Sequence, residues 1–111
     1  MAYLHQNLAE DKWHKMSLAE QLANISSEVG RAAKWQGKDQ KSFDGAVGRA
    51  LELFNLTLED MRWRGRLIEI GRLKDVFCDG VLGGKEYGTD LHSLEKYFYP
   101  FMALTAKKYN F

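Results

Sequence analysis

Cysteine and proline are almost absent from this chain of 111 residues, and each shortage excludes a class of structure. Cys78 is the only cysteine, so the chain forms neither an intramolecular disulfide nor a cysteine-ligated zinc cluster. Pro100 is the only proline, which favours long helices without interruption. No apolar run approaches the ~18 residues of a membrane-spanning helix, and the first residues lack the apolar centre of a signal peptide. We therefore expect a cytoplasmic protein that has no contact with a membrane.

A strong charge of either sign is also missing. Sixteen Lys and Arg residues oppose fifteen Asp and Glu residues, which leaves a net charge of +1. Dedicated nucleic-acid binders are strongly basic, so binding to nucleic acid would require separate positive and negative surfaces. With 45% hydrophobic residues, the composition is that of an ordinary soluble protein, and the length fits a single domain.

Four segments have the apolar period of an α-helix, in which residues three and four apart share one face. They are predicted at 17–36, 40–58, 61–82 and 90–109. Ser17 and Glu20 have the spacing of a capping box, and Gly37 suits the end of the first helix. Since the connections are short, consecutive helices should be antiparallel. The sequence predicts an all-α fold, an antiparallel up-down-up-down four-helix bundle over residues 16–111, with a loosely ordered N-terminal arm at 1–15.

The segment 60–84 is the longest with a helical period and no proline. A second apolar set lies off its main apolar face and consists of Ile68, Val76 and Leu82; the main face carries Trp63, Leu67, Ile70, Leu73, Phe77 and Val81. A helix with apolar residues on both sides usually lies inside an assembly. We expect the other helices to pack around this one, or a second subunit to cover its outer set.

Several residues off the main apolar faces are candidates for a subunit interface. Gly45 and Gly48 leave room for a neighbouring backbone on the outer face of the second helix; the alternative is that they only weaken that helix. Burying each aliphatic side chain is worth about 1.5–3 kcal/mol, and closed twofold symmetry is the commonest arrangement. We expect a homodimer or a higher homo-oligomer, or an unidentified protein partner. The candidate interface residues are Trp35, Gly45, Gly48, Ile68, Val76 and Leu82.

The start of the third helix is rich in arginine. Positive side chains there oppose the helix dipole, which is tolerated when acids pair with them or when an anion binds. Arginine beside an aromatic residue can hold phosphates and stack on bases. Internal ion pairs with Glu59, Asp60, Glu69 or Glu20 are the alternative. The candidates for binding an anion or nucleic acid are Arg62, Trp63, Arg64, Arg66 and Arg72.

A second basic cluster lies around the end of the first helix and the start of the second. In an antiparallel bundle we expect it to lie near Asp75 and Asp79, which would balance its charge. The cluster consists of Arg31, Lys34, Lys38 and Lys41.

Motifs of catalysis are missing. His5, His14 and His92 lack the spacing of metal ligands, and no Glu-x-x-His occurs. Phosphate-binding loops and the Gly-x-Ser-x-Gly motif are also missing. We predict no metal and no cofactor. A non-enzymatic interaction module that acts through self-association or a protein partner is favoured over a nucleic-acid-associated accessory protein, and both are favoured over an enzyme.

Two blocks of the sequence, at 17–39 and 49–79, together with the shorter pieces 87–90 and 95–98, resemble a group of small bacterial proteins of unknown function. The resemblance covers most of residues 16–106. It implies a bacterial, cytoplasmic and all-helical protein, and it transfers no catalytic residue.

Overall fold

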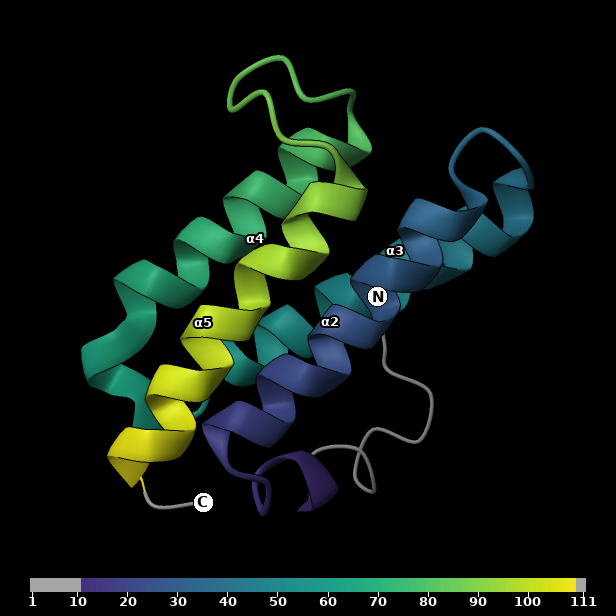
Figure 1. Cartoon of the computed structure of the whole chain (residues 1–111). Coiled ribbons are helices and arrows are strands. Elements are labelled where there is room, and N and C mark those ends of the chain that lie inside the picture. Colours follow the sequence, from purple (N-terminus) through teal and green to yellow (C-terminus); the bar gives the residue numbers. More distant parts are fainter. Residues whose placement is uncertain (1–10, 110–111) are drawn as a thin grey trace.

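The computed structural model describes residues 11–109, except for the side chains of residue 101 and of residues 104–109. Figure 1 shows four long helices in up-down-up-down order, each antiparallel to the next. No strand occurs within the described range, so the predicted fold class is confirmed. The elements are α2 (Leu18–Trp35), α3 (Gln40–Leu58), the short 3-10 helix η1 (Met61–Arg66), α4 (Leu67–Val81) and α5 (Leu91–Tyr109).

The caps that the sequence predicts are present. The Glu20 amide donates to the Ser17 hydroxyl over 3.1 Å, and the Ser17 amide donates to the Glu20 carboxylate over 2.9 Å. The Asp39 side chain accepts from the Ser42 amide at the start of α3. Gly37, which connects the two helices, has a φ of 76°, a conformation that favours glycine. Local signals therefore determine where α2 begins and ends and where α3 begins.

The central helix is α2, and the prediction that the segment 60–84 occupies that position is wrong. Contacts of α2 with both α3 and α5 are the most extensive between helices. Its buried residues are Leu18, Gln21, Leu22, Ile25, Ser26, Glu28, Val29, Ala32 and Ala33, whereas those of α4 are Ile70, Leu73, Phe77, Asp79 and Gly80. Since α4 buries only one side, its second apolar set lies largely outside the core.

The predicted α-helix over 61–82 is divided. Its first six residues form the 3-10 helix η1, in which Trp63 has non-helical φ and ψ of −105° and 24°. The Asp60 carboxylate accepts from the Arg62 amide, and the indole of Trp63 turns inward to hydrogen-bond with Gln21. These two contacts shape the turn, and the regular helix starts only at Leu67.

The N-terminal segment is attached to the bundle by Trp13. Residues 1–10 of the predicted arm lie outside the described residues. Trp13 belongs to the hydrophobic core, with 4% of its surface exposed. The core thus extends beyond the predicted boundary at residue 16.

Close packing of α4 against α5 can be tested at two glycines of α4, Gly71 and Gly80. A Cβ at Gly80 would lie 2.7 Å from Cδ2 of Leu91, a buried core side chain, whereas a Cβ at Gly71 would have no atom within 4 Å. We expect Gly80→Ala to lower the free energy of unfolding by about 1–3 kcal/mol, through overpacking. Gly71→Ala should raise it by about 0.5–1 kcal/mol, because alanine is the better helix former. Urea denaturation of both variants tests this, and equal effects would contradict the close approach.

Candidate functional site

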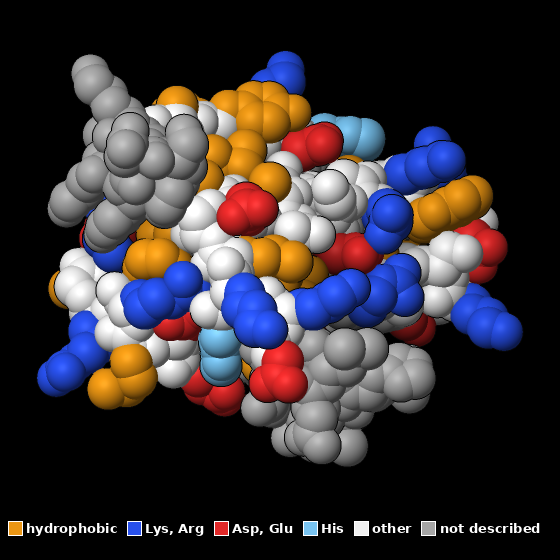
Figure 2. Space-filling model, turned by 90° about the horizontal axis from the view of Figure 1, so that it is seen from below, with side chains coloured by type: hydrophobic (Ala, Val, Ile, Leu, Met, Phe, Trp, Pro, Cys, Tyr) orange, Lys and Arg blue, Asp and Glu red, His pale blue; other side chains and the backbone are white. Residues whose placement is uncertain are grey.

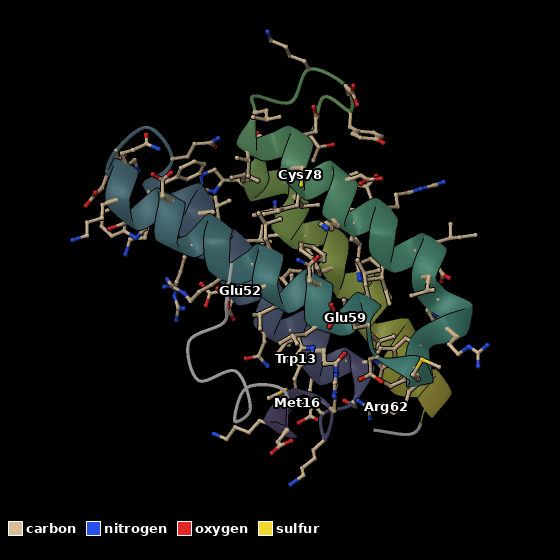
Figure 3. All side chains as sticks on the ribbon, turned by 180° about the vertical axis from the view of Figure 1, so that it is seen from behind. Trp13, Met16, Glu52, Glu59, Arg62 and Cys78 are labelled. Atoms are coloured by element: carbon tan, nitrogen blue, oxygen red, sulfur yellow. The ribbon has the colours of Figure 1, made fainter. Side chains whose placement is uncertain are left out.

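The short helix η1 holds Arg62, the first arginine that the sequence identified as a candidate. Arg62 donates to the Asp60 carboxylate from Nε over 3.0 Å and from Nη2 over 2.7 Å. Nη2 also donates to the Met16 carbonyl over 2.8 Å, and the guanidinium lies 4.5 Å from the centre of the Trp63 ring. Figure 3 shows Arg62 and Met16 at the same end of the bundle as Trp13. The charge of Arg62 is therefore balanced within the molecule.

Behind this pair lies a buried polar cluster centred on Gln21, whose side chain is fully buried. Its Nε2 donates to the Trp13 carbonyl over 2.8 Å and to Asp60 over 3.1 Å. Its Oε1 accepts from the Trp63 indole over 2.8 Å, and the Trp13 indole donates to the Thr57 hydroxyl over 3.0 Å. We call this cluster the Gln21 network; it comprises Trp13, Gln21, Thr57, Asp60, Arg62 and Trp63. Because buried polar groups are costly unless they are paired, the network fixes how these segments meet.

The charge of Asp60 belongs to this network. Burial of the carboxyl acts to raise the pKa of Asp60, but hydrogen bonds from Arg62 and Gln21 outweigh it, so the pKa lies below its ordinary value. Conversely, the hydrogen bond to Asp60 holds the pKa of Arg62 above its ordinary value. Both groups are charged at neutral pH, and they stabilise one another.

The five predicted anion-binding residues do not form one surface. Arg62 contacts Trp63, but Arg66 is buried and forms an ion pair with Glu69 over 3.3 Å. Arg64 is exposed, and Arg72 lies on α4 beside an open groove. Figure 2 shows acidic and apolar side chains between the Lys and Arg side chains at this end of the bundle. The arrangement agrees with the alternative of internal ion pairs for Arg62 and Arg66.

No ion pair of the described residues joins the second basic cluster to Asp75 or Asp79, the acids that were predicted near it. The Asp79 carboxylate does not pair with it and instead accepts from the amides of Glu86 and Tyr87, over 3.0 and 2.9 Å. Two cations of the cluster, Arg31 and Lys41, line a hollow of about 390 Å³ between α2 and α3. We call it the α2–α3 hollow; its lining residues are Arg31, Trp35, Lys41, Ser42, Gly45, Ala46 and Arg49. Arg49 was missed because its sequence neighbours give no sign of a cluster.

The outer face of α4 carries the candidate interface residues of that helix. Ile68 is 81% exposed and Leu82 is 79% exposed, whereas Val76 packs partly against the core. Beside Ile68, a groove of about 600 Å³ lies between α4, the loop that carries Tyr87, and α5.

The other candidate interface residues lie elsewhere. Trp35 packs partly against the core, and Gly45 lines the α2–α3 hollow. Gly48 is open on its outer side, because a Cβ there would have no atom within 4 Å. The six candidates therefore divide between two surfaces, the outer face of α4 and the outer side of the α2–α3 hairpin.

Cys78 has the properties of a weak nucleophile. Figure 3 shows it on α4, where it is partly buried. Burial raises the pKa of its thiol; Lys74 lowers that pKa and Asp75 raises it, and the net shift is upward. Most of the thiol is therefore protonated at neutral pH.

Comparisons with protein-family models, with curated proteins and with solved structures found no match to this chain. In the described part of the chain, no helix has the length and apolarity to cross a membrane. Within the same range, no three His, Cys, Asp or Glu side chains are grouped to hold a metal ion.

Proposed function

We propose that the protein is a non-enzymatic helical interaction module that pairs with a second copy of itself through the outer face of α4. The observation that carries the proposal is the exposure of Ile68 and Leu82, at opposite ends of that face. Large aliphatic side chains exposed on an otherwise charged helix face are typical of interaction surfaces. A cytoplasmic location is part of the proposal, because a chain with one cysteine does not depend on disulfides.

The charges between these two residues favour a second copy of this chain as the partner. Arg72 and Asp75 are both exposed, and neither forms an ion pair with another described residue. When two α4 helices meet antiparallel about a twofold axis, Ile68 of each copy faces Leu82 of the other, and Arg72 faces Asp75. With Ile68 directly opposite Leu82, Arg72 of one copy and Asp75 of the other are three residues out of register, about 4.5 Å along the helix axis at ~1.5 Å per residue, an offset that the long arginine side chain can span. The face is therefore complementary to itself in both charge and apolarity.

A charge-reversal experiment tests this pairing. Arg72→Glu places two like-charged pairs in the proposed dimer, and so does Asp75→Arg, so each variant alone should be monomeric. An equimolar mixture should form a heterodimer, because the introduced glutamate of one chain then faces the introduced arginine of the other. Light scattering after size exclusion measures the mass. The matched control is Lys38→Glu, which makes the same charge change as Arg72→Glu at an exposed site outside α4 and should remain dimeric.

Two results would refute the proposal. One is a wild-type mass of a single chain at micromolar concentration, which would leave a different protein as the partner. The other is a dimer that survives both single reversals, which would place the interface elsewhere. Circular dichroism of each variant shows that it remains helical, so a monomer is distinguished from an unfolded chain.

The alternative of a nucleic-acid-associated accessory protein acting through Arg62, Arg64, Arg66 and Arg72 has less support. Two of these arginines are held in ion pairs with Asp60 and Glu69. The observation that favours an anionic ligand lies instead at the α2–α3 hollow.

A further inference from the structure

We propose that the α2–α3 hollow binds a phosphate group. Three cationic side chains line it from two helices, Arg31 from α2 and Lys41 and Arg49 from α3. The inference is independent of the pairing through α4, because none of the residues that line the hollow belongs to that helix.

The two arginines share one carboxylate. Glu28, whose side chain is 11% exposed, accepts from Arg31 Nη1 over 2.8 Å and from Arg49 Nε over 3.3 Å. One negative charge therefore faces two positive charges, which leaves an excess positive charge at the hollow. Each guanidinium uses one nitrogen on Glu28, and its other nitrogens form no further hydrogen bond to a described residue. A guanidinium held in this way presents its remaining N–H groups in the fork that suits phosphate oxygens.

Asp39 and Asp44, which lie beside the hollow's residues in the sequence, form no ion pair with its cations. Asp39 caps α3 and accepts from the amide and hydroxyl of Ser42, over 3.4 and 3.2 Å. Asp44 accepts from the Gln40 side chain over 2.7 Å. Lys41 forms no ion pair with any described acid. Its ammonium lies in the first turn of α3, where the partial positive charge of the helix adds to its own.

The missing side chain at Gly45 leaves the hollow open. A Cβ built there would lie 3.8 Å from Nη1 of Arg49, which is an ordinary van der Waals distance. A ligand oxygen can therefore approach the helix backbone beside this guanidinium, at the place a longer side chain would occupy. Gly45, a candidate interface residue, would in this proposal give a ligand access to Arg49.

The chemistry that this site recognises is a phosphate carried either by a small molecule or by a nucleic-acid backbone. The probes are therefore pyrophosphate and a short single-stranded oligonucleotide, each titrated into the full-length protein while backbone amide NMR shifts are recorded. We expect both probes to shift the amides of Lys41, Ser42 and Gly45 and to leave those of α4 unchanged. If the natural ligand is a nucleic-acid backbone, the oligonucleotide binds much more tightly than pyrophosphate. If the natural ligand is a small molecule, the oligonucleotide binds no more tightly than pyrophosphate.

Two glycine substitutions provide the decisive comparison. Gly45→Glu puts a carboxylate into the hollow beside Arg49, whereas Gly48→Glu adds the same charge to the same helix at a site with no atom within 4 Å. Both replace glycine by a better helix former, so the fold should be retained. We expect Gly45→Glu to weaken binding of either probe by about tenfold or more and Gly48→Glu by less than about twofold.

A second pair of variants tests the same site without adding a side chain at a glycine. Lys41→Gln removes a cation of the hollow, and Lys38→Gln removes an exposed lysine that does not line it. Only the first should reduce the affinity, by about threefold to tenfold. The proposal is overturned if neither probe shifts the amides of residues 41–49, or if the two members of each pair weaken binding equally, which would indicate unspecific attraction to the whole surface.

Discussion

Replacing Trp13 by alanine is expected to lower the free energy of unfolding by about 3–5 kcal/mol, the usual cost of removing a buried aromatic side chain. The indole is buried in the core, and its N–H donates to the Thr57 hydroxyl on α3. Its backbone carbonyl accepts from Gln21 on α2. The N-terminal segment is thus part of the folded bundle, and its loss affects two other helices. Urea denaturation followed by circular dichroism measures the change.

Trp13→Phe separates packing from hydrogen bonding. Phenylalanine keeps most of the apolar contact but has no N–H to donate. The Thr57 hydroxyl still donates to the Leu53 carbonyl over 2.9 Å, so it keeps one partner. We expect a loss of about 1 kcal/mol from the missing hydrogen bond, with a further part from the smaller ring. A cost below about 1 kcal/mol for Trp13→Ala would show that the segment is only loosely held and that the described contacts contribute little.

The helices and their caps could be predicted because they depend on neighbours in the sequence. Ser17 and Glu20 are three residues apart, and their reciprocal hydrogen bonds need only the local helix geometry. The apolar period likewise indicates which face of each helix is buried. These signals are independent of how the four helices are placed, so they predicted the fold class together with the ends of α2 and α3.

The position of each helix within the bundle depends on contacts that are distant in the sequence. Gln21 is polar and breaks the apolar pattern of α2, yet it is fully buried because Trp13, Asp60 and Trp63 provide its partners. No local pattern reveals those partners. A prediction from the sequence alone therefore misses the central position of α2 in the bundle. It assigns that position to the segment with the longest apolar pattern.

The charge clusters show the same limitation. Asp79 was expected to balance the charge of the second basic cluster. Instead, its carboxylate accepts hydrogen bonds from the amides of Glu86 and Tyr87, in the loop that follows α4. Arg49 joins Arg31 only because both reach Glu28 across the packed helices α2 and α3. Whether a charge is free or paired is decided by such contacts, which explains why the basic start of the third helix was predicted as a site and the α2–α3 hollow was not.

Replacing Asp60 by asparagine should remove about 2–3 kcal/mol of stability at pH 7, because hydrogen bonds to charged groups contribute about 1.5–3 kcal/mol. Asparagine turns an N–H donor toward Arg62 and Gln21, both of which donate to the aspartate. The contribution of Arg62 is reduced by solvent, since 41% of its side chain is exposed. The buried amide of Gln21 therefore supplies a large share of the loss.

The pH dependence identifies the charge of Asp60 as the cause. Its pKa in the folded state lies below the ordinary value, so its contribution is fully present above the unfolded-state value of about 3.9. That contribution disappears as the pH falls through the folded-state value, because the protonated carboxyl no longer attracts Arg62. The difference in unfolding free energy between wild type and Asp60→Asn should therefore be constant from pH 7 to about 5 and shrink below pH ~4. Urea titrations across this range measure it, with the exposed neighbour Glu59→Gln as a control that should stay within about 0.5 kcal/mol of wild type. A difference that remains constant down to pH ~2.5 would show that packing, and not the carboxylate charge, connects Asp60 to the Gln21 network.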